Sequence, residues 1–225
     1  MTPTRQVRAI LEKDLRIEWK MTTRIFTLFC FGFTLLLLFS FAVGSETDVL
    51  RKHAGAYLWM AVLLSSTLQL ERSFLTETES NALEAILLVP TSPTALFYGK
   101  ALANWAQLLL LALSCLPLVV VLYGPELLGP LFWMPVIAVL GTAGLAAPGT
   151  LYAGMTARIR GGQVLLPLLL FPLVVPAVLA AVKATGLVLL GDPMNQTGSW
   201  VALLACFDLV FWGLSGVLFT KIVEL

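Results

Sequence analysis

Charged side chains are scarce in this sequence. Only 12% of its 225 residues are charged and 59% are hydrophobic, whereas a soluble globular domain is about one quarter charged and one half apolar. A chain of this length has too small an interior to hide so much apolar surface from water. The composition therefore excludes a water-soluble domain and indicates a protein that is embedded in lipid.

The sequence also lacks the alternating segments of about ten residues that are typical of membrane β-barrels. Its apolar runs are continuous and about twenty residues long, the length of a helix that crosses about 30 Å of hydrocarbon. Lipid offers no partner to backbone polar groups, so such runs are expected to be helical. We predict an all-α integral membrane protein with one domain, residues 1–225, and six transmembrane helices. The runs lie at residues 25–43, 54–70, 101–123, 130–155, 164–182 and 199–220.

Catalytic motifs are missing as well. The sequence contains no phosphate-binding loop, no H-E-x-x-H element and no G-x-S-x-G element. Its three cysteines, Cys30, Cys115 and Cys206, are isolated within apolar runs, where packing is their usual role. We therefore predict a protein that is not an enzyme, binds no metal or cofactor itself and has no nucleic-acid partner. A separate chain would supply any ATP hydrolysis.

Positive charge is unevenly distributed along the chain. Residues 1–24 combine basic side chains with apolar residues at helical spacing, which predicts an amphipathic helix on the membrane surface. Of the 14 Lys and Arg residues, only Arg51, Lys52 and Lys183 fall in connections that we assign to the far side of the membrane. Because positive residues are retained in the cytoplasm, we expect both termini of this multi-pass protein to be cytoplasmic.

Tryptophan and histidine are the side chains most relevant to membrane boundaries and to haem. The 6 tryptophans are dispersed, and most lie near predicted span ends, as interface anchors do. The single histidine, His53, lies in a predicted outer connection. It is a weak candidate for a haem ligand, and its simpler interpretation is a solvated loop residue.

The longest connection covers residues 71–100 and faces the cytoplasm in this arrangement. Residues 76–80 are of the kind that begins a helix, apolar residues follow at 82–89, and Pro90 and Pro93 end the unit. The pattern predicts a short helix. It is either a surface helix that packs on the bundle or a docking helix that enters a groove on a soluble partner.

Two of the apolar runs contain residues that are unusual in a membrane helix, namely three prolines in one run and an aspartate in another. Pro167, Pro172 and Pro176 each remove a helical hydrogen bond from the run 164–182, so this helix is expected to bend. Such breaks serve as hinges or line substrate paths in transporters, although proline is also frequent in membrane helices without that role. Asp208 lies within the last run, either as a pathway residue or as a hydrogen-bonded structural acid.

The run 130–155 is rich in small residues, among them Gly141, Gly144 and Gly149. Small residues three and four positions apart let helix backbones approach closely. The pattern predicts a packing face within the bundle, or alternatively an interface between subunits.

Several stretches resemble a known family. LERSF, LEAILLVPTSP and YGKALANW occur between Trp59 and Trp105, and RGGQVLLPLLLFPLVVPAVLAAVKATG covers residues 160–186. Together with KDLRIEWK at 13–20, they resemble the haem exporter protein B family (CcmB), the ABC transporter permease subunit of bacterial cytochrome c maturation. The two internal motifs are fairly specific, and the resemblance covers most of the chain.

The resemblance implies an ABC-2-like permease whose ATP is bound and hydrolysed by a separate cytoplasmic subunit. The residues that it places in the ATPase-coupling segment are Glu71, Arg72, Glu79, Leu83, Glu84, Pro90 and Lys100. The pathway or hinge candidates are Arg160, Pro167, Pro172 and Pro176 of the fifth-helix motif, with Asp208 added from the residue analysis. The docking interpretation of segment 71–100 is favoured by the same resemblance.

The family also implies partners and a location in the bacterial inner membrane. The expected partners are the ATPase subunit, a second permease copy, a tryptophan-rich haem-handling membrane protein and a periplasmic haem chaperone. Haem is then the cargo, or the subunit transmits movement that frees the haem-loaded chaperone. Two other functions fit the residues, namely an exporter permease for another cargo and a scaffold subunit that transports nothing.

Overall fold

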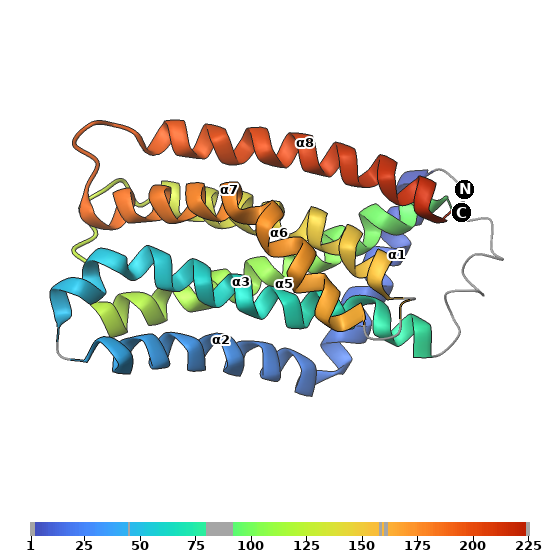
Figure 1. Ribbon diagram of the computed structural model, residues 1–225, viewed down its shortest axis with the longest axis horizontal. Helices are drawn as coiled ribbons and strands as arrows, with labels where there is room; N and C mark the ends of the chain where they lie inside the picture. The colour runs from blue at the N-terminus through green and yellow to red at the C-terminus, as the bar shows by residue number, and fades with distance from the viewer. Residues whose placement is uncertain (1–2, 45, 80–91, 158, 160–161, 224–225) are drawn as a thin grey trace.

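The computed structural model describes residues 3–44, 46–79, 92–157, 159 and 162–223, and these residues form helices without any strand. The helices are α1 (Pro3–Lys20), α2 (Thr22–Val43), α3 (Thr47–Glu79), α5 (Pro93–Tyr123), α6 (Trp133–Thr156), α7 (Gly162–Leu190) and α8 (Thr197–Val223) (Figure 1). The prediction of an all-α protein is confirmed.

The helices that follow α1 form one elongated bundle. Both chain termini lie at the same end of the bundle, and the α2–α3 and α7–α8 connections lie at the other end (Figure 1). Helix α1 crosses the end that holds the termini and packs against α5 and α2. The N-terminal helix is therefore present as expected, and it is attached to the bundle rather than separate from it.

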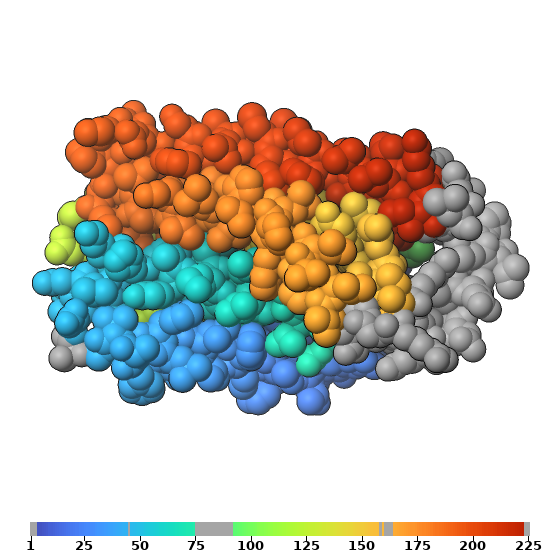
Figure 2. Space-filling view, in the orientation of Figure 1, coloured from blue at the N-terminus to red at the C-terminus, as the bar shows by residue number. Residues whose placement is uncertain are grey.

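The outer surface of the bundle is strongly apolar. Phe41 of α2, Val121 of α5 and Leu209 of α8 are each at least 78% exposed, and α2, α3, α7 and α8 share one long face (Figure 2). Soluble monomers rarely expose apolar surface that extends over several elements. This surface suits contact with lipid tails, as the composition predicted.

Five helices in the described part of the chain are long and apolar enough to cross a membrane, namely α2, α5, α6, α7 and α8. Helix α3 contains the predicted run 54–70 but is not among them. Its Ser65, Ser66 and Gln69 lower its hydropathy, and all three are buried. They are screened because α3 packs against α2, α5, α6 and α7. Five of the predicted spans are thus confirmed as candidates, and the sixth depends on α3.

Two predicted connections are partly helical in the structure. Helix α3 begins at Thr47, so His53 is a helical residue rather than a loop residue. Helix α7 extends to Leu190, so Lys183 also lies within a helix. Hydropathy marks the part of a helix that lies in hydrocarbon, whereas the helix itself continues until its backbone is interrupted. The long stem of an exposed lysine lets its ammonium group reach the interface.

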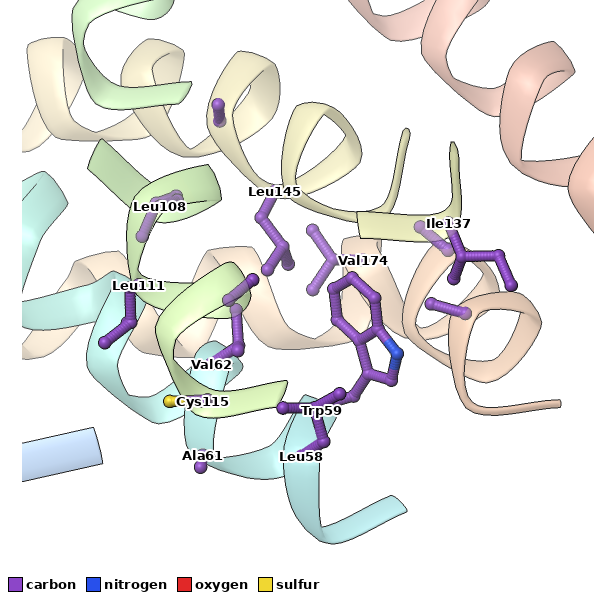
Figure 3. Close-up of a cluster of buried hydrophobic side chains, with 14 of the residues drawn as sticks. Leu58, Trp59, Ala61, Val62, Leu108, Leu111, Cys115, Ile137, Leu145 and Val174 are labelled. Carbon is purple, nitrogen blue, oxygen red and sulfur yellow. The ribbon is translucent and has the colours of Figure 1, made fainter. Parts of the chain in front are cut away.

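Helix α6 is central and packs against α3, α5, α7 and α8. The Trp59 ring of α3 lies so close to Gly141 that a Cβ there would overlap it, and Figure 3 shows the ring directed toward Val174. Trp59 Nε1–H donates to Thr185 Oγ1 at 2.9 Å. The small residues of α6 therefore form a packing face inside the chain, as predicted. Because Trp59 is only 2% exposed, its interpretation as an interface anchor is wrong.

Candidate functional site

Both flanks of the predicted coupling segment 71–100 are helical. Helix α3 ends at Glu79, α5 begins at Pro93, and the two helices pack against each other. Ser92 caps α5, because its Oγ accepts the Ala95 N–H at 3.3 Å, and proline is well suited to the first helical turn. The coupling candidates that lie outside the described residues are Leu83, Glu84 and Pro90.

The predicted short helix of this segment, with its apolar residues 82–89, lies outside the described residues, and so does Ser80 of its expected start. Residues 76–79 form the last turn of α3 instead of beginning a new helix. No glycine or proline follows Gly55 in α3, so nothing in the backbone ends the helix before these polar residues. Threonine and glutamate favour a helix start only where the chain before them is not already helical.

Lys100, two turns into α5, is the most buried charged side chain among the described residues. It is 2% exposed, and its Nζ donates to the Ser73 backbone oxygen at 2.9 Å and to Asp14 Oδ2 at 3.4 Å. The ammonium group also lies 4.8 Å from the centroid of the Phe74 ring, which is a favourable cation–π distance. Because a buried charge needs such partners, Lys100 joins α5 to both α3 and α1.

Asn104, one turn further along α5, extends this polar contact to α6. Its Nδ2 donates to Ser73 Oγ at 3.1 Å and to Thr150 Oγ1 at 3.0 Å. These five polar residues form the Lys100 cluster, namely Lys100, Asp14, Ser73, Asn104 and Thr150. It connects α1, α3, α5 and α6 through buried or half-buried polar groups.

Helix α1 is seated directly on the backbone of α5 beside the cluster. A Cβ on Gly99 would lie 2.7 Å from the Ile10 Cβ and 3.2 Å from the Val7 carbonyl oxygen. Only glycine permits this close approach. The contact places Asp14, one turn after Ile10, beside Lys100.

A small polar cavity of about 50 Å³ adjoins the Lys100 cluster. Its lining includes Glu18 of α1, Arg72 of α3 and Gln107 of α5, and the Gln107 side chain accepts a hydrogen bond from the Gln69 amide. Burial raises the pKa of the Glu18 carboxyl, an effect that Arg24 opposes. Burial likewise raises the pKa of Glu71, against the opposing effect of Arg72. The cytoplasmic end predicted for the bundle thus contains two half-buried acids, Glu18 and Glu71, whose pKa values burial raises and nearby arginines lower.

The sequence identified only part of this site. Lys100, Glu71 and Arg72 were predicted from the family resemblance, and the structure brings Lys100 and Arg72 to one cavity. Asp14 and Thr150 were not singled out. They are separated from Lys100 by tens of residues, and neither lies in a motif that marks a contact. The polar type of Asn104 within an apolar run is the one local signal that would have pointed to it.

The three prolines of α7 lie on the outer side of the helix. Pro167 is half-buried, and Pro172 and Pro176 are exposed, whereas Leu166 and Leu170 are buried. Helix α7 changes direction along its length (Figure 1), as its interior prolines lead one to expect. The prolines therefore face outward at a bend and do not line the interior of the bundle.

Asp208 lies within α8 at its contact with α6 and α7. The Asp208 Oδ1 atom is 3.0 Å from the position that a Cβ on Gly144 would occupy, and Ala177 adjoins the same position. The residue is 8% exposed, and neither carboxyl oxygen has a hydrogen-bond partner among the described residues. A buried polar group without a partner is destabilising.

The other predicted candidates lie apart from this site. His53 is exposed, and its ring meets Tyr57 edge to face at 6.3 Å. No group of three His, Cys, Asp or Glu side chains suited to a metal occurs among the described residues. Arg160 lies outside them.

Comparison with known proteins gives consistent matches over most of the chain. A family model described as CcmB protein matches residues 5–224. Heme exporter protein B of Rhodobacter capsulatus is 33% identical over 174 residues, which are 77% of this chain and 79% of the relative. Heme exporter protein B of Paracoccus denitrificans is 32% identical over 192 residues, 84% and 87% of the two chains. The Escherichia coli K12 protein of the same name is 32% identical over 188 residues, 78% and 79%.

Proposed function

The chain belongs to the CcmB family, the permease subunits of the ABC transporter of cytochrome c maturation, and we propose that its segment 71–100 receives movement from the ATPase partner. The protein is a multi-pass membrane subunit without catalytic activity of its own. In this proposal Glu79 and Glu84 contact the ATPase, and Glu71, Arg72, Leu83 and Pro90 shape the docking surface.

The Lys100 cluster is the observation that supports this proposal. It joins α3, which contains the start of the segment, to α5, which contains its end, through the bond between Lys100 and Ser73, and it joins α5 to α1 through Asp14. A displacement of the segment would therefore move α3, α5 and α1 together. Contiguous buried contacts of this kind are how a mechanical change reaches distant helices.

The topology that fits this function has six spans and cytoplasmic termini. Helix α3 is the sixth span, since its polar side chains are sheltered by neighbouring helices and need no contact with lipid. Helix α1 is an interfacial helix within one permease domain, residues 1–225. The end of the bundle that holds the termini also holds the end of α3, the start of α5 and helix α1 with its basic residues, as expected for an inner-membrane protein with that end in the cytoplasm.

The relatives are named heme exporter proteins, which supports haem as the cargo. We propose that ATP-driven movement either exports haem or releases a haem-loaded periplasmic chaperone. In both cases α7 is the hinge, through Pro167, Pro172 and Pro176, and Arg160 of the same sequence motif is a further pathway candidate. A second permease copy and a tryptophan-rich haem-handling membrane protein complete the complex. His53 at the opposite end remains a weak candidate for contact with haem.

Charge removal at the docking surface tests this function. The double variant Glu79→Gln/Glu84→Gln is expected to lower c-type cytochrome maturation about tenfold or more, because lost charge pairs at an interface cost several kcal/mol. ATP hydrolysis by the purified complex would become independent of the permease. Maturation is measured by haem staining of c-type cytochromes, and binding by co-purification of the ATPase.

The matched control is Glu46→Gln/Glu126→Gln, which removes two exposed acids at the opposite end of the bundle. This control is expected to mature cytochromes normally. Normal maturation and ATPase coupling in the Glu79/Glu84 variant would refute the docking assignment. ATPase activity that is unchanged when the permease is absent would instead indicate a scaffold.

Asp208 offers a separate test of a pathway residue. Asp208→Leu is expected to raise the melting temperature by roughly 2–4 °C, because an apolar side chain of similar size replaces a buried carboxyl that has no partner among the described residues. Maturation is expected to fall in the same variant, since polar groups retained in a membrane span at a cost in stability usually serve function. A stabilised variant with normal maturation would contradict the pathway role.

A further inference from the structure

An apolar groove of about 190 Å³ lies between α1, α2 and α5. Its apolar lining includes Leu15, Trp19, Leu28, Phe29, Ala106 and Leu110. The polar side chains that reach it are Glu18 and Gln107, and Gln107 is already bonded to Gln69. The groove therefore offers long apolar walls with polar groups at few positions.

The groove lies where the charged part of the chain meets the apolar part. Helix α1 carries most of the charge of the N-terminal region, and α2 is an apolar candidate span from Thr22 onward. Trp19, at the groove, is 76% exposed, and tryptophan rings favour the boundary between water and hydrocarbon. At the boundary between water and hydrocarbon, the apolar ligand that a membrane supplies is a lipid acyl chain rather than a water-soluble molecule.

Positive charge is concentrated beside the groove. Two of the three acids of α1, Glu12 and Asp14, are in ion pairs. The third, Glu18, is half-buried, which raises the pKa of its carboxyl, and Arg24 lowers that pKa. Lys20 is exposed and Arg24 half-buried on the two sides of the α1–α2 turn. Lys20 and Arg24 together outnumber Glu18, so the turn carries net positive charge next to the apolar groove, which complements a lipid with an anionic headgroup.

We propose that this groove binds an acyl chain of an anionic phospholipid whose phosphate contacts Lys20 and Arg24. The apolar walls hold the chain, and the two cations select a net negative headgroup over a zwitterionic one. The bound chain fills the space between α1, α2 and α5 and so supports the seat of α1 on the bundle. This inference does not depend on the docking role of segment 71–100.

Native mass spectrometry of the purified permease–ATPase complex in nanodiscs tests the proposal. The nanodiscs contain phosphatidylglycerol and phosphatidylcholine in equal amounts, and the retained lipid is counted per permease chain. The unchanged protein is expected to retain phosphatidylglycerol preferentially. Lys20→Gln/Arg24→Gln is expected to reduce that preference roughly fifteenfold to thirty-fivefold, because each cation near an anionic surface contributes about a fourfold to sixfold gain in affinity.

A second variant tests the apolar walls. Ala106→Leu fills the groove and is expected to reduce retention of either lipid roughly tenfold, because each excluded methylene costs about fourfold in affinity. The controls are Ala202→Leu, an exposed position on α8, and Arg5→Gln, an exposed position near the start of α1 that does not line the groove. Equal retention of the two lipids by the unchanged protein would show ordinary annular lipid and overturn the proposal. So would retention in Ala106→Leu equal to that in Ala202→Leu.

Discussion

Replacement of Lys100 by methionine is expected to lower c-type cytochrome maturation about tenfold or more and to reduce the free energy of unfolding by on the order of 3 kcal/mol. Methionine retains an unbranched stem against Phe74 but loses the hydrogen bonds to the Ser73 carbonyl and to Asp14. Asp14, whose side chain is 14% exposed, keeps a charge whose partner on α5 is gone. Removing one partner of a buried ion pair usually costs about 3–5 kcal/mol. We expect the lower value here, because Asp14 retains some contact with water.

A double variant separates stability from coupling. Asp14→Asn/Lys100→Met removes both charges, so much of the lost stability is expected to return, since removing a whole buried ion pair is often close to neutral. Maturation is expected to stay low, because the polar link between α1 and α5 is still absent. Stability is followed by thermal unfolding in detergent, and coupling by ATPase activity and haem staining.

The matched control for Lys100 is Lys183→Met, which makes the same change at an exposed position of α7. It is expected to leave stability and maturation nearly unchanged. Recovery of maturation in step with stability in the double variant would show that Lys100 only stabilises the fold. The proposed transmission through the Lys100 cluster would then be wrong.

Gly141→Ala is expected to destabilise the protein by about 1–3 kcal/mol, the usual cost of overpacking a well-packed core. The added methyl group would overlap the Trp59 ring. The ring is 2% exposed and its Nε1–H is bonded to Thr185, so it has little room to move away. The measurement is the melting temperature together with the fraction of protein that elutes as a folded complex.

Gly213→Ala on α8 is the control for this substitution, because no atom lies within 4 Å of the position a Cβ would take there. It is expected to be neutral or slightly stabilising, since alanine favours a helix over glycine. Combining Gly141→Ala with Trp59→Leu is expected to cost less than the sum of the two single changes, because the clash is absent from the double variant. Equal stability of Gly141→Ala and the unchanged protein would show that the Trp59 ring can yield.

The span positions were predictable because apolar runs record a direct physical requirement, the exclusion of charge from hydrocarbon. Helix α3 shows the limit of that signal. Its Ser65, Ser66 and Gln69 do not contact lipid, because other helices cover them. A hydropathy value is the same for a polar residue that is covered by protein and for one that is exposed to water. The ends of α3 and α7 were misplaced for a related reason, since helices continue past the hydrocarbon.

The candidate site, like the fold, was predictable only in part. Segment 71–100 stood out as the longest polar connection, and the family resemblance marked Lys100 within it. The partners of Lys100 were not predictable, because a lysine in an apolar run does not reveal which acid or carbonyl neutralises it. The contact with Asp14 bridges 86 residues.

The sequence by itself determined that this protein is helical, membrane-embedded and without catalytic chemistry, and its motifs determined the family. These properties depend on composition and local order, which the linear chain contains. Only the tertiary structure decided that α1 is seated on α5 through Gly99, that Lys100 joins three helices, and that the prolines of α7 face outward. Those facts depend on which surfaces of distant helices meet, and close packing fixes that choice only when the whole bundle has formed.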